Sequence, residues 1–212
     1  MTPLKEKSAW LRNNREGKAR SASGFSLAEM LVVLVILIIL TVLGTSRYSA
    51  SARRKDMAAC KLNLQKVYLA LSIYRSDNGT FPALKSAERS EEALSLLVPK
   101  STTTTEIFIC PGSRDSALPE GERFANRRIS YAYYMGHTTN DSPQEILVTD
   151  WQINNEPKHQ GQPVFSSDGK KPGNNHYGEG GNLLLIGGAV AGSPPKASRD
   201  LLFSAPVMLL NP

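Results

Sequence analysis

The side chains with the clearest capacity for chemistry are two cysteines, three histidines and a few aspartates in a chain of 212 residues. Cys60 and Cys110 are too few for a four-cysteine zinc site. His159, His176 and the aspartates fit no H-E-x-x-H helix, no EF-hand loop and no C-x-x-C site. No G-x-S-x-G motif is present, and GEGG at 178–181 lacks the Lys-Ser/Thr pair of a phosphate-binding loop. The sequence therefore predicts no enzymatic activity.

A long apolar stretch lies near the start of the chain. Residues 30–43 read MLVVLVILIILTVL, and Glu29 is the one ionisable residue between 25 and 44. At about 1.5 Å per residue, 25–44 measures about 30 Å as a helix, the thickness of a hydrocarbon core. Residues 1–24 carry a net charge of +4. This pattern predicts a membrane-spanning segment with the N-terminus in the cytoplasm, although the basic residues from 47 to 55 weaken the orientation signal.

The residues in front of the apolar stretch form a recognisable motif. Residues 24–29 read G-F-S-L-A-E. This resembles the processing site of type IV prepilins and type II secretion pseudopilins. The resemblance implies that a prepilin peptidase cuts after Gly24 and N-methylates Phe25. It also implies that Glu29, the fifth mature residue, acts in subunit assembly.

The position of Glu29 agrees with an assembly role on physical grounds. A carboxylate near the end of an apolar helix is costly and tends to be functional. A suitable partner is the α-amino group of Phe25 on a neighbouring subunit, since leaving either charge buried alone would cost about 3–5 kcal/mol. The alternative is a stray acid at the edge of a signal anchor.

The helical pattern continues beyond the apolar stretch. Apolar residues recur every three or four positions along one face, at Met57, Cys60, Leu64, Val67, Leu71 and Tyr74. Asn78 and Gly79 supply a helix stop, so the spacing predicts one helix over 25–77. The segment YRSDNGTFP at 74–82 is similar to the stretch that ends the long helix of major pseudopilins.

The remaining residues, 81–212, predict a small α+β head. The strand candidates are short segments between turn signals, at 106–110, 129–134, 145–151 and 182–186. Residues 86–98 predict a short helix, and Gly187 with Gly188 suits a tight turn. The predicted fold class is α+β and pilin-like, with a long N-terminal helix, membrane-spanning in its first half, packed against a small antiparallel sheet.

The predicted organisation has four parts. They are a basic leader at 1–24 that is removed, a transmembrane and fibre-core helix at 25–44, an amphipathic stem at 45–80, and the head at 81–212. Three head segments, IFICPGS, ISYAYYMG and NHYGEGGNLLLIGGAV, resemble a branch of pilin-like proteins with a variable C-terminal domain. Gly187-Gly188 stands where that branch has Asp-Gly, so no role of that aspartate carries over.

Two further interpretations concern the cysteines and the aspartates of the head. Cys60 lies on the stem face that the head should cover, and Cys110 ends a strand candidate. Outside the cytoplasm they could form a disulfide, and two buried free thiols are the alternative. Some major pseudopilins hold calcium in a C-terminal loop, which makes Asp150 and Asp168 calcium candidates. Turn-forming aspartates without an ion are the alternative, and no other cofactor is expected.

The net charge of +6 first suggests a nucleic-acid partner. Most of it belongs to the leader, and residues 81–212 carry 12 basic and 14 acidic groups. No nucleic-acid partner is therefore expected.

The resemblance predicts a structural subunit of a type II secretion or type IV pilus-like fibre. The expected partners are the prepilin peptidase, other copies and related pseudopilins in a helical fibre, an inner-membrane assembly platform and inner-membrane lipid. The expected location is the inner membrane, single-pass, with a cytoplasmic N-terminus and a periplasmic head. The alternatives are a pilin-like surface protein whose head binds an external ligand, and a signal-anchored envelope protein that does not polymerise.

Overall fold

The computed structural model of the chain describes residues 24–138 and 140–212, with side chains at all of these except 44–50. The leader predicted at 1–24 therefore lies outside the described residues, apart from Gly24. The chain divides into two compact units, Met1–Ser46 and Arg47–Pro212. Each unit is described by itself below.

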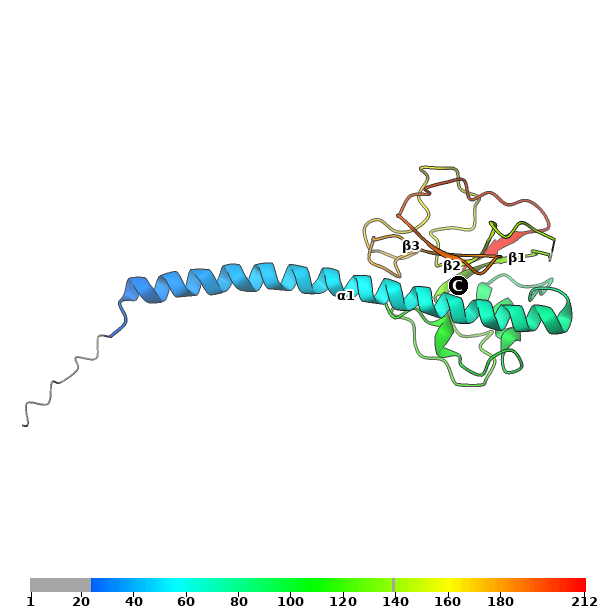
Figure 1. Ribbon diagram of the computed structural model, residues 1–212, viewed down its shortest axis with the longest axis horizontal. Helices are drawn as coiled ribbons and strands as arrows, with labels where there is room; N and C mark the ends of the chain where they lie inside the picture. Colours follow the sequence, from blue (N-terminus) through cyan, green and yellow to red (C-terminus); the bar gives the residue numbers. More distant parts are fainter. Residues whose placement is uncertain (1–23, 139) are drawn as a thin grey trace, which may run out of the picture. The chain divides into compact units, whose positions relative to one another are not determined.

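One helix, α1 (Leu27–Asn78), accounts for 52 residues and runs through the boundary between the units. It is drawn from blue to cyan in Figure 1. Its bounds lie close to the predicted 25–77. At its C-terminal end Gly79 adopts a positive φ of 75°, and its amide donates to the Arg75 carbonyl. This is the left-handed stop that the Asn-Gly pair predicts.

The fold class as predicted, with a membrane-spanning first half of the helix at 25–44, is wrong. Within the part of the chain whose side chains are described, no helix combines the length and the apolar character that crossing a bilayer requires.

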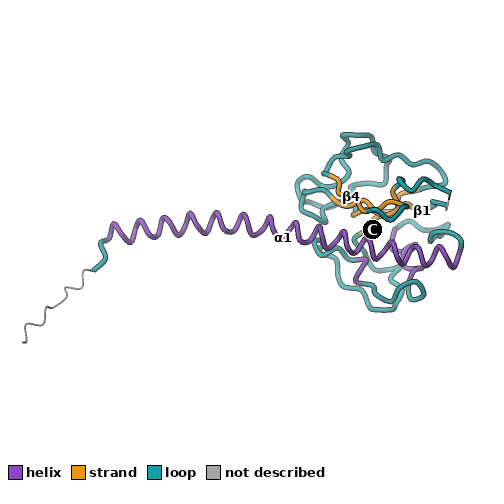
Figure 2. Tube along the Cα trace, viewed as in Figure 1, coloured by secondary structure: helices purple, strands orange, loops and turns teal. Residues whose placement is uncertain are grey.

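The second unit contains five strands in one antiparallel sheet, in the order β4-β3-β2-β1-β5. Figure 2 draws these strands in orange among extensive loops. Their bounds are β1 (Tyr131–Met135), β2 (Ile146–Asp150), β3 (Gly181–Leu185), β4 (Val190–Ser193) and β5 (Met208–Leu210). Three of the four strand candidates thus correspond to β1, β2 and β3, and the predicted small antiparallel sheet is present.

Two local expectations differ from the structure. Residues 106–110 form no strand, because Glu106–Phe108 is a 3-10 helix, η2, closed by the Ile109 amide bonding to the Glu106 carbonyl. The predicted helix at 86–98 is shorter, with α2 (Ser90–Leu94) followed by the 3-10 turn η1 (Ser95–Leu97). Ser90, the first residue of α2, does not cap this helix, because Arg89 occupies the N-cap position and makes no side-chain hydrogen bond there.

The sheet is covered on both faces, because alternate residues of a strand point to opposite sides. In β1, Tyr131 and Tyr133 belong to one apolar cluster, and Ala132 and Tyr134 to the other. The first cluster also contains the inner face of α1 and the segment after it, whereas the second contains the loops between β2 and β5. The α1 members of the first cluster are Cys60, Leu64, Val67, Ala70 and Leu71.

A glycine turn between β3 and β4 brings the sheet close to α1. Gly188 has φ of 87°, and a Cβ placed on it would lie 2.6 Å from the Tyr68 ring. Only a residue without a side chain fits this combination of backbone conformation and close approach. The predicted tight turn at Gly187-Gly188 is therefore confirmed.

Candidate functional site

The residues of the predicted processing motif stand at the start of α1. Phe25 precedes the helix and has an exposed fraction of 79%. Ser26 and Glu29 form a reciprocal capping box: the Ser26 amide donates to Glu29 Oε2 at 2.9 Å, and the Glu29 amide donates to Ser26 Oγ at 3.2 Å. Both bonds satisfy amides that an α-helix leaves without intrahelical partners.

The capping box is a local role for Glu29 that the sequence interpretation missed. The signal was available, because Ser-x-x-Glu before an apolar run is typical of a helix start. All atoms of the box lie in residues 26–29 and would remain after cleavage at Gly24. Glu29 therefore has a structural function in addition to the predicted assembly role.

The first turns of α1 carry a continuous apolar surface. The large apolar side chains from Met30 to Leu43 are exposed by 46–62% each. Thr41 is the polar exception, and its hydroxyl donates back to the carbonyls of Leu37 and Ile38. Exposing such an apolar surface to water is unfavourable, because each Å² of apolar area costs about 25 cal/mol. Such a segment calls for an apolar environment supplied from outside the chain.

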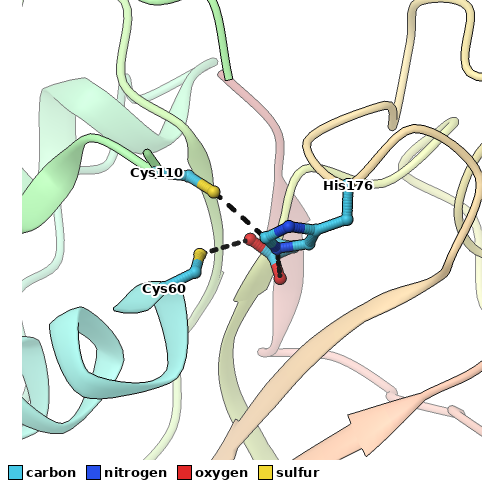
Figure 3. Close-up of side chains that lie close together, drawn as sticks. Cys60, Cys110 and His176 are labelled. Carbon is cyan, nitrogen blue, oxygen red and sulfur yellow. Dashed lines mark hydrogen bonds and ion pairs between the residues drawn. The ribbon is translucent and has the colours of Figure 1, made fainter. Parts of the chain in front are cut away.

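The second unit holds a different kind of candidate site, a buried cluster of Cys60, Cys110, Asp150 and His176. Figure 3 labels Cys60, Cys110 and His176 and shows their side chains turned toward one another. The four potential ligand atoms of the cluster all lie within 4.8 Å of one another, and each residue is at most 1% exposed. Cys60 comes from the middle of α1, Cys110 from the loop after η2, Asp150 from the end of β2, and His176 from the turn before β3.

The contacts inside this Cys–Asp–His cluster are short. The Cys60 thiol donates to Asp150 Oδ1 at 3.0 Å, and His176 Nε2 lies 3.1 Å from Asp150 Oδ2. Cys110 Sγ lies 3.7 Å from the same His176 nitrogen. The Tyr131 hydroxyl adds a further contact at 3.1 Å from Cys60 Sγ. Four segments of the chain thus meet through their polar atoms inside the core.

Asparagine side chains complete the surroundings of the Asp150 carboxylate. Asn175 donates from Nδ2 to Oδ1 at 3.0 Å. Asn182 donates to Oδ2 twice, from its backbone amide at 2.6 Å and from Nδ2 at 3.1 Å. A buried carboxylate is tolerated only when its oxygens accept several hydrogen bonds or face a positive charge, and Asp150 has both.

The ionisation of the cluster follows from these contacts. Burial alone would raise the pKa of Asp150, but the hydrogen bond and charge of His176 and the bonds from Cys60 and Asn175 hold this pKa below its ordinary value. Burial alone would lower the pKa of His176, but the bond to Asp150 and the contact with Cys110 raise it to about 10. Burial raises the pKa of the Cys60 thiol well above its ordinary value, and the hydrogen bond with Cys110 and the negative charge of Asp150 raise it further. Asp150 and His176 therefore form a buried ion pair beside a protonated Cys60.

The backbone around His176 is fitted to this arrangement. A Cβ on Gly112 would lie 2.4 Å from the Asn175 carbonyl oxygen and 3.2 Å from His176 Nδ1. Nδ1 itself is buried and has no hydrogen-bond partner among the described residues. The ring is thus held by the tight backbone at Gly112 on one side and by Asp150 on the other.

The geometry does not suit cysteine-nucleophile catalysis. In a catalytic Cys–His–Asp triad, the cysteine nucleophile bonds to one nitrogen of the histidine and the orienting carboxylate bonds to the other. Here Cys110 and Asp150 both face Nε2. The complete burial of all four side chains also leaves no space for a substrate.

The structure brings the two predicted disulfide partners into this one cluster, and both are free thiols in it. The packing of Cys60 toward the head and its closeness to Cys110 follow the predicted topology. The participation of Asp150 and His176 was not predicted, because no spacing rule connects residues from four separate segments.

The calcium candidates lie in two different environments. Asp150 faces two sulfur atoms and an imidazole, which is not the all-oxygen environment that calcium prefers. Asp168 is exposed and accepts bonds from the Ser166 hydroxyl and the Lys170 amide, as a turn-forming aspartate does. Among residues 24–138 and 140–212, the structure does not bring these two aspartates together with other ligands of a calcium site.

A second group of ligating side chains, His137, Asp141 and Glu145, is explained by its own turn. Asp141 accepts bonds from the Thr138 amide and hydroxyl, and it lies 2.8 Å from His137 Nδ1. The other ring nitrogen of His137 lies 2.9 Å from the Ile146 carbonyl oxygen. Both histidine nitrogens are thus engaged within the protein.

Comparisons of the chain with protein-family models, with curated proteins and with solved structures each found no match.

Proposed function

We propose that the chain is a pilin-like structural subunit of an envelope fibre, of the type II secretion pseudopilin or type IV pilus kind. The observation that carries this proposal is the order of features at the start of α1. An exposed Gly24-Phe25 junction is followed at once by the Ser26–Glu29 capping box and the exposed apolar surface from Met30 to Leu43. Gly24, Phe25 and Glu29 stand at the three positions of the prepilin pattern that the sequence resembles.

The proposal assigns a cover to the apolar surface. In a helical fibre the first halves of neighbouring helices bury one another, which removes this surface from water. The partners are other copies of the chain and related subunits, the prepilin peptidase that cuts after Gly24 and methylates Phe25, and an inner-membrane assembly platform. The location that goes with them is the inner membrane before assembly, with the head on its extracytoplasmic side.

Glu29 has two roles under this proposal, and they can be separated. Its carboxylate caps the helix of its own chain, and its negative charge attracts the α-amino group of a neighbouring Phe25. Glutamine keeps the ability to accept the Ser26 amide bond but lacks the charge. Charge and cap are therefore distinguished by one pair of variants.

The first test is the mass of the mature N-terminus in cells that contain a prepilin peptidase. We expect a chain that begins with methylated Phe25. A matched variant, Gly24→Ala, meets no steric obstacle in the described structure, since a Cβ there has no neighbour within 4 Å. Loss of cleavage in that variant would therefore report peptidase recognition. A mature protein that begins at Met1, or after Gly44, would support the signal-anchored alternative instead.

The second test is co-assembly of processed variants with the unmodified chain. If charge pairing drives assembly, Glu29→Gln and Glu29→Ala both fail to enter fibres and Ser26→Ala enters them. If Glu29 acts only as a cap, Glu29→Gln assembles normally. Normal assembly of both Glu29 variants would refute the assembly role.

The alternative of a ligand-binding head is less well supported. A hollow of about 760 Å³ is lined in part by the acidic residues Glu106, Asp115 and Glu120 and by the apolar residues Ile109 and Leu118. Small-molecule sites are mostly apolar with few polar groups, and this hollow carries three acidic residues. The structural role in a fibre therefore remains the function that we propose.

A further inference from the structure

The Cys–Asp–His cluster contains the donor set of a zinc site. Two thiolates, one imidazole and one carboxylate are ligands that Zn²⁺ accepts, and four protein ligands are typical of a structural site. The four side chains converge from separate segments, and their ligand atoms all lie within 4.8 Å of one another. From these observations we propose that Cys60, Cys110, Asp150 and His176 bind one structural Zn²⁺ ion in the head.

The distances support four-coordinate binding. For zinc bonds of about 2.3 Å to sulfur and about 2.0–2.2 Å to nitrogen or oxygen, neighbouring corners of a tetrahedron lie about 3.3–3.8 Å apart. The Cys110 sulfur lies 3.7 Å from His176 Nε2, and that nitrogen lies 3.1 Å from Asp150 Oδ2. The Cys60 sulfur lies 3.0 Å from Asp150 Oδ1. One of the two Asp150 oxygens would bind the ion, and because the four ligand atoms lie within 4.8 Å of one another, small side-chain shifts give the tetrahedral spacing.

The protons and charges of the site balance in a simple way. When zinc binds, the two thiols and Nε2 of His176 release their protons to solvent. Two thiolates, one carboxylate and one divalent cation leave a single net negative charge. The donors that surround the ligands stabilise this charge. They come from the Tyr131 hydroxyl and from the amides of Asn175 and Asn182.

The surroundings explain why the ion would be structural and not catalytic. A catalytic zinc keeps one position open for water, whereas four protein ligands close the coordination shell. The ligands are buried, so no substrate reaches the ion. What the ion would do is join the middle of α1 to the η2 loop, to β2 and to the turn before β3.

The test is the metal content of the full chain, purified in detergent after expression with Zn²⁺ in the medium. We expect about one zinc ion per chain by elemental analysis and by native mass spectrometry. Both thiols should resist alkylation until the chain is unfolded in the presence of a chelator. Replacement by Co²⁺ should give the absorption of a tetrahedral thiolate complex.

Matched variants locate the ion. Cys110→Ser and His176→Ala should each lose the bound zinc and the cobalt spectrum. His159→Ala is the control, because its side chain is 68% exposed and lies outside the cluster. Elemental analysis of the unmodified chain keeps the test decisive even if a cluster variant fails to fold.

Three results would overturn the proposal. One is a Cys60–Cys110 disulfide in non-reducing peptide mapping of the folded chain. Another is a metal-free chain with two free thiols after refolding with Zn²⁺. The third is zinc that remains bound in both cluster variants, which would place the ion elsewhere.

Discussion

Glu29 and Asp150 are both carboxylates that accept backbone hydrogen bonds, but they belong to different units and have opposite surroundings. Glu29 is exposed, and the bonds of its capping box link it to Ser26, three residues away. Asp150 is fully buried, and its partners include Cys60, which is 90 residues away in the sequence. The polar contacts of the first carboxylate are local, whereas those of the second hold distant segments together.

This difference separates two kinds of functional residue. Removing Asp150 leaves several buried donors without an acceptor, so its loss should appear in the stability of the head. Removing Glu29 disturbs one helix start, and any further effect depends on the proposed contact between copies of the chain. Substitutions in the two regions can therefore break or sharpen the comparison, beginning with those of largest expected effect.

The largest effect is expected for Asp150→Ala. The change leaves His176, Asn175 and Asn182 without their acceptor and should lower the free energy of unfolding by about 4 kcal/mol. Denaturant unfolding followed by circular dichroism measures it. The control is Asp77→Ala on the exposed face of α1, with a change within about 0.5 kcal/mol. Equal stability of the two variants would contradict the central role of the cluster.

A slightly smaller effect is expected for Leu64→Ala. Leu64 is fully buried between α1 and the sheet, and its truncation should cost about 3 kcal/mol through lost burial and a cavity. Leu62 on the same helix is 58% exposed, so Leu62→Ala should change stability by less than about 0.5 kcal/mol. The same unfolding experiment compares them. A similar loss in both would mean that the outer face of α1 is also covered.

An intermediate effect is expected for Tyr133→Phe. The Tyr133 hydroxyl is buried and donates to the Pro82 carbonyl at 2.8 Å, which ties the segment after α1 to β1. Its removal leaves a buried acceptor unsatisfied, at a cost of about 1–2 kcal/mol in the free energy of unfolding. Tyr177→Phe, on an exposed ring, serves as the control and should be neutral. No measurable loss in Tyr133→Phe would show that water replaces the hydroxyl.

The smallest effect on the head is expected for Ser26→Ala. Loss of the N-cap should weaken the first turn of α1 by about 1 kcal/mol and leave the unfolding of the head unchanged. Hydrogen exchange of the amides at 26–29 reports the first quantity and denaturant unfolding the second. Ser51→Ala, in the interior of the same helix, should leave exchange at 26–29 unaltered. A destabilised head in Ser26→Ala would show that the two units depend on each other.

Several elements could be predicted from the sequence because their signals are local. The period of apolar residues and the Asn78-Gly79 stop define α1. Aromatic and β-branched residues mark β1 and β2, and a run of leucines marks β3. The strand β5 was not predicted, because a strand of only three residues carries almost no signal in the sequence. Its pairing with β1 depends on tertiary packing. Residues 106–110 have strand-like composition, but there the 3-10 hydrogen bond of η2 prevails.

For the candidate sites too, the residues that are close in the sequence could be predicted most directly to act together. The Gly24-Phe25 motif and Glu29 are adjacent residues, so the pattern is visible in the sequence, as was the Ser26 cap that we overlooked. Cys60 and Cys110 could be brought together by the expected packing of stem and head. Asp150 and His176 join them only through the register of β2 and β3, which single-residue patterns do not encode.

The Cys–Asp–His cluster also indicates the order in which parts of the head fold. Its members are spread from Cys60 to His176, and Asn182 completes the shell of the carboxylate. Closing loops of this length costs entropy before any contact forms, so the cluster assembles late in folding. A chain that is still being synthesised keeps both thiols open to solvent until Asn182 has been added. The accessibility of the two thiols therefore reports whether the head is complete.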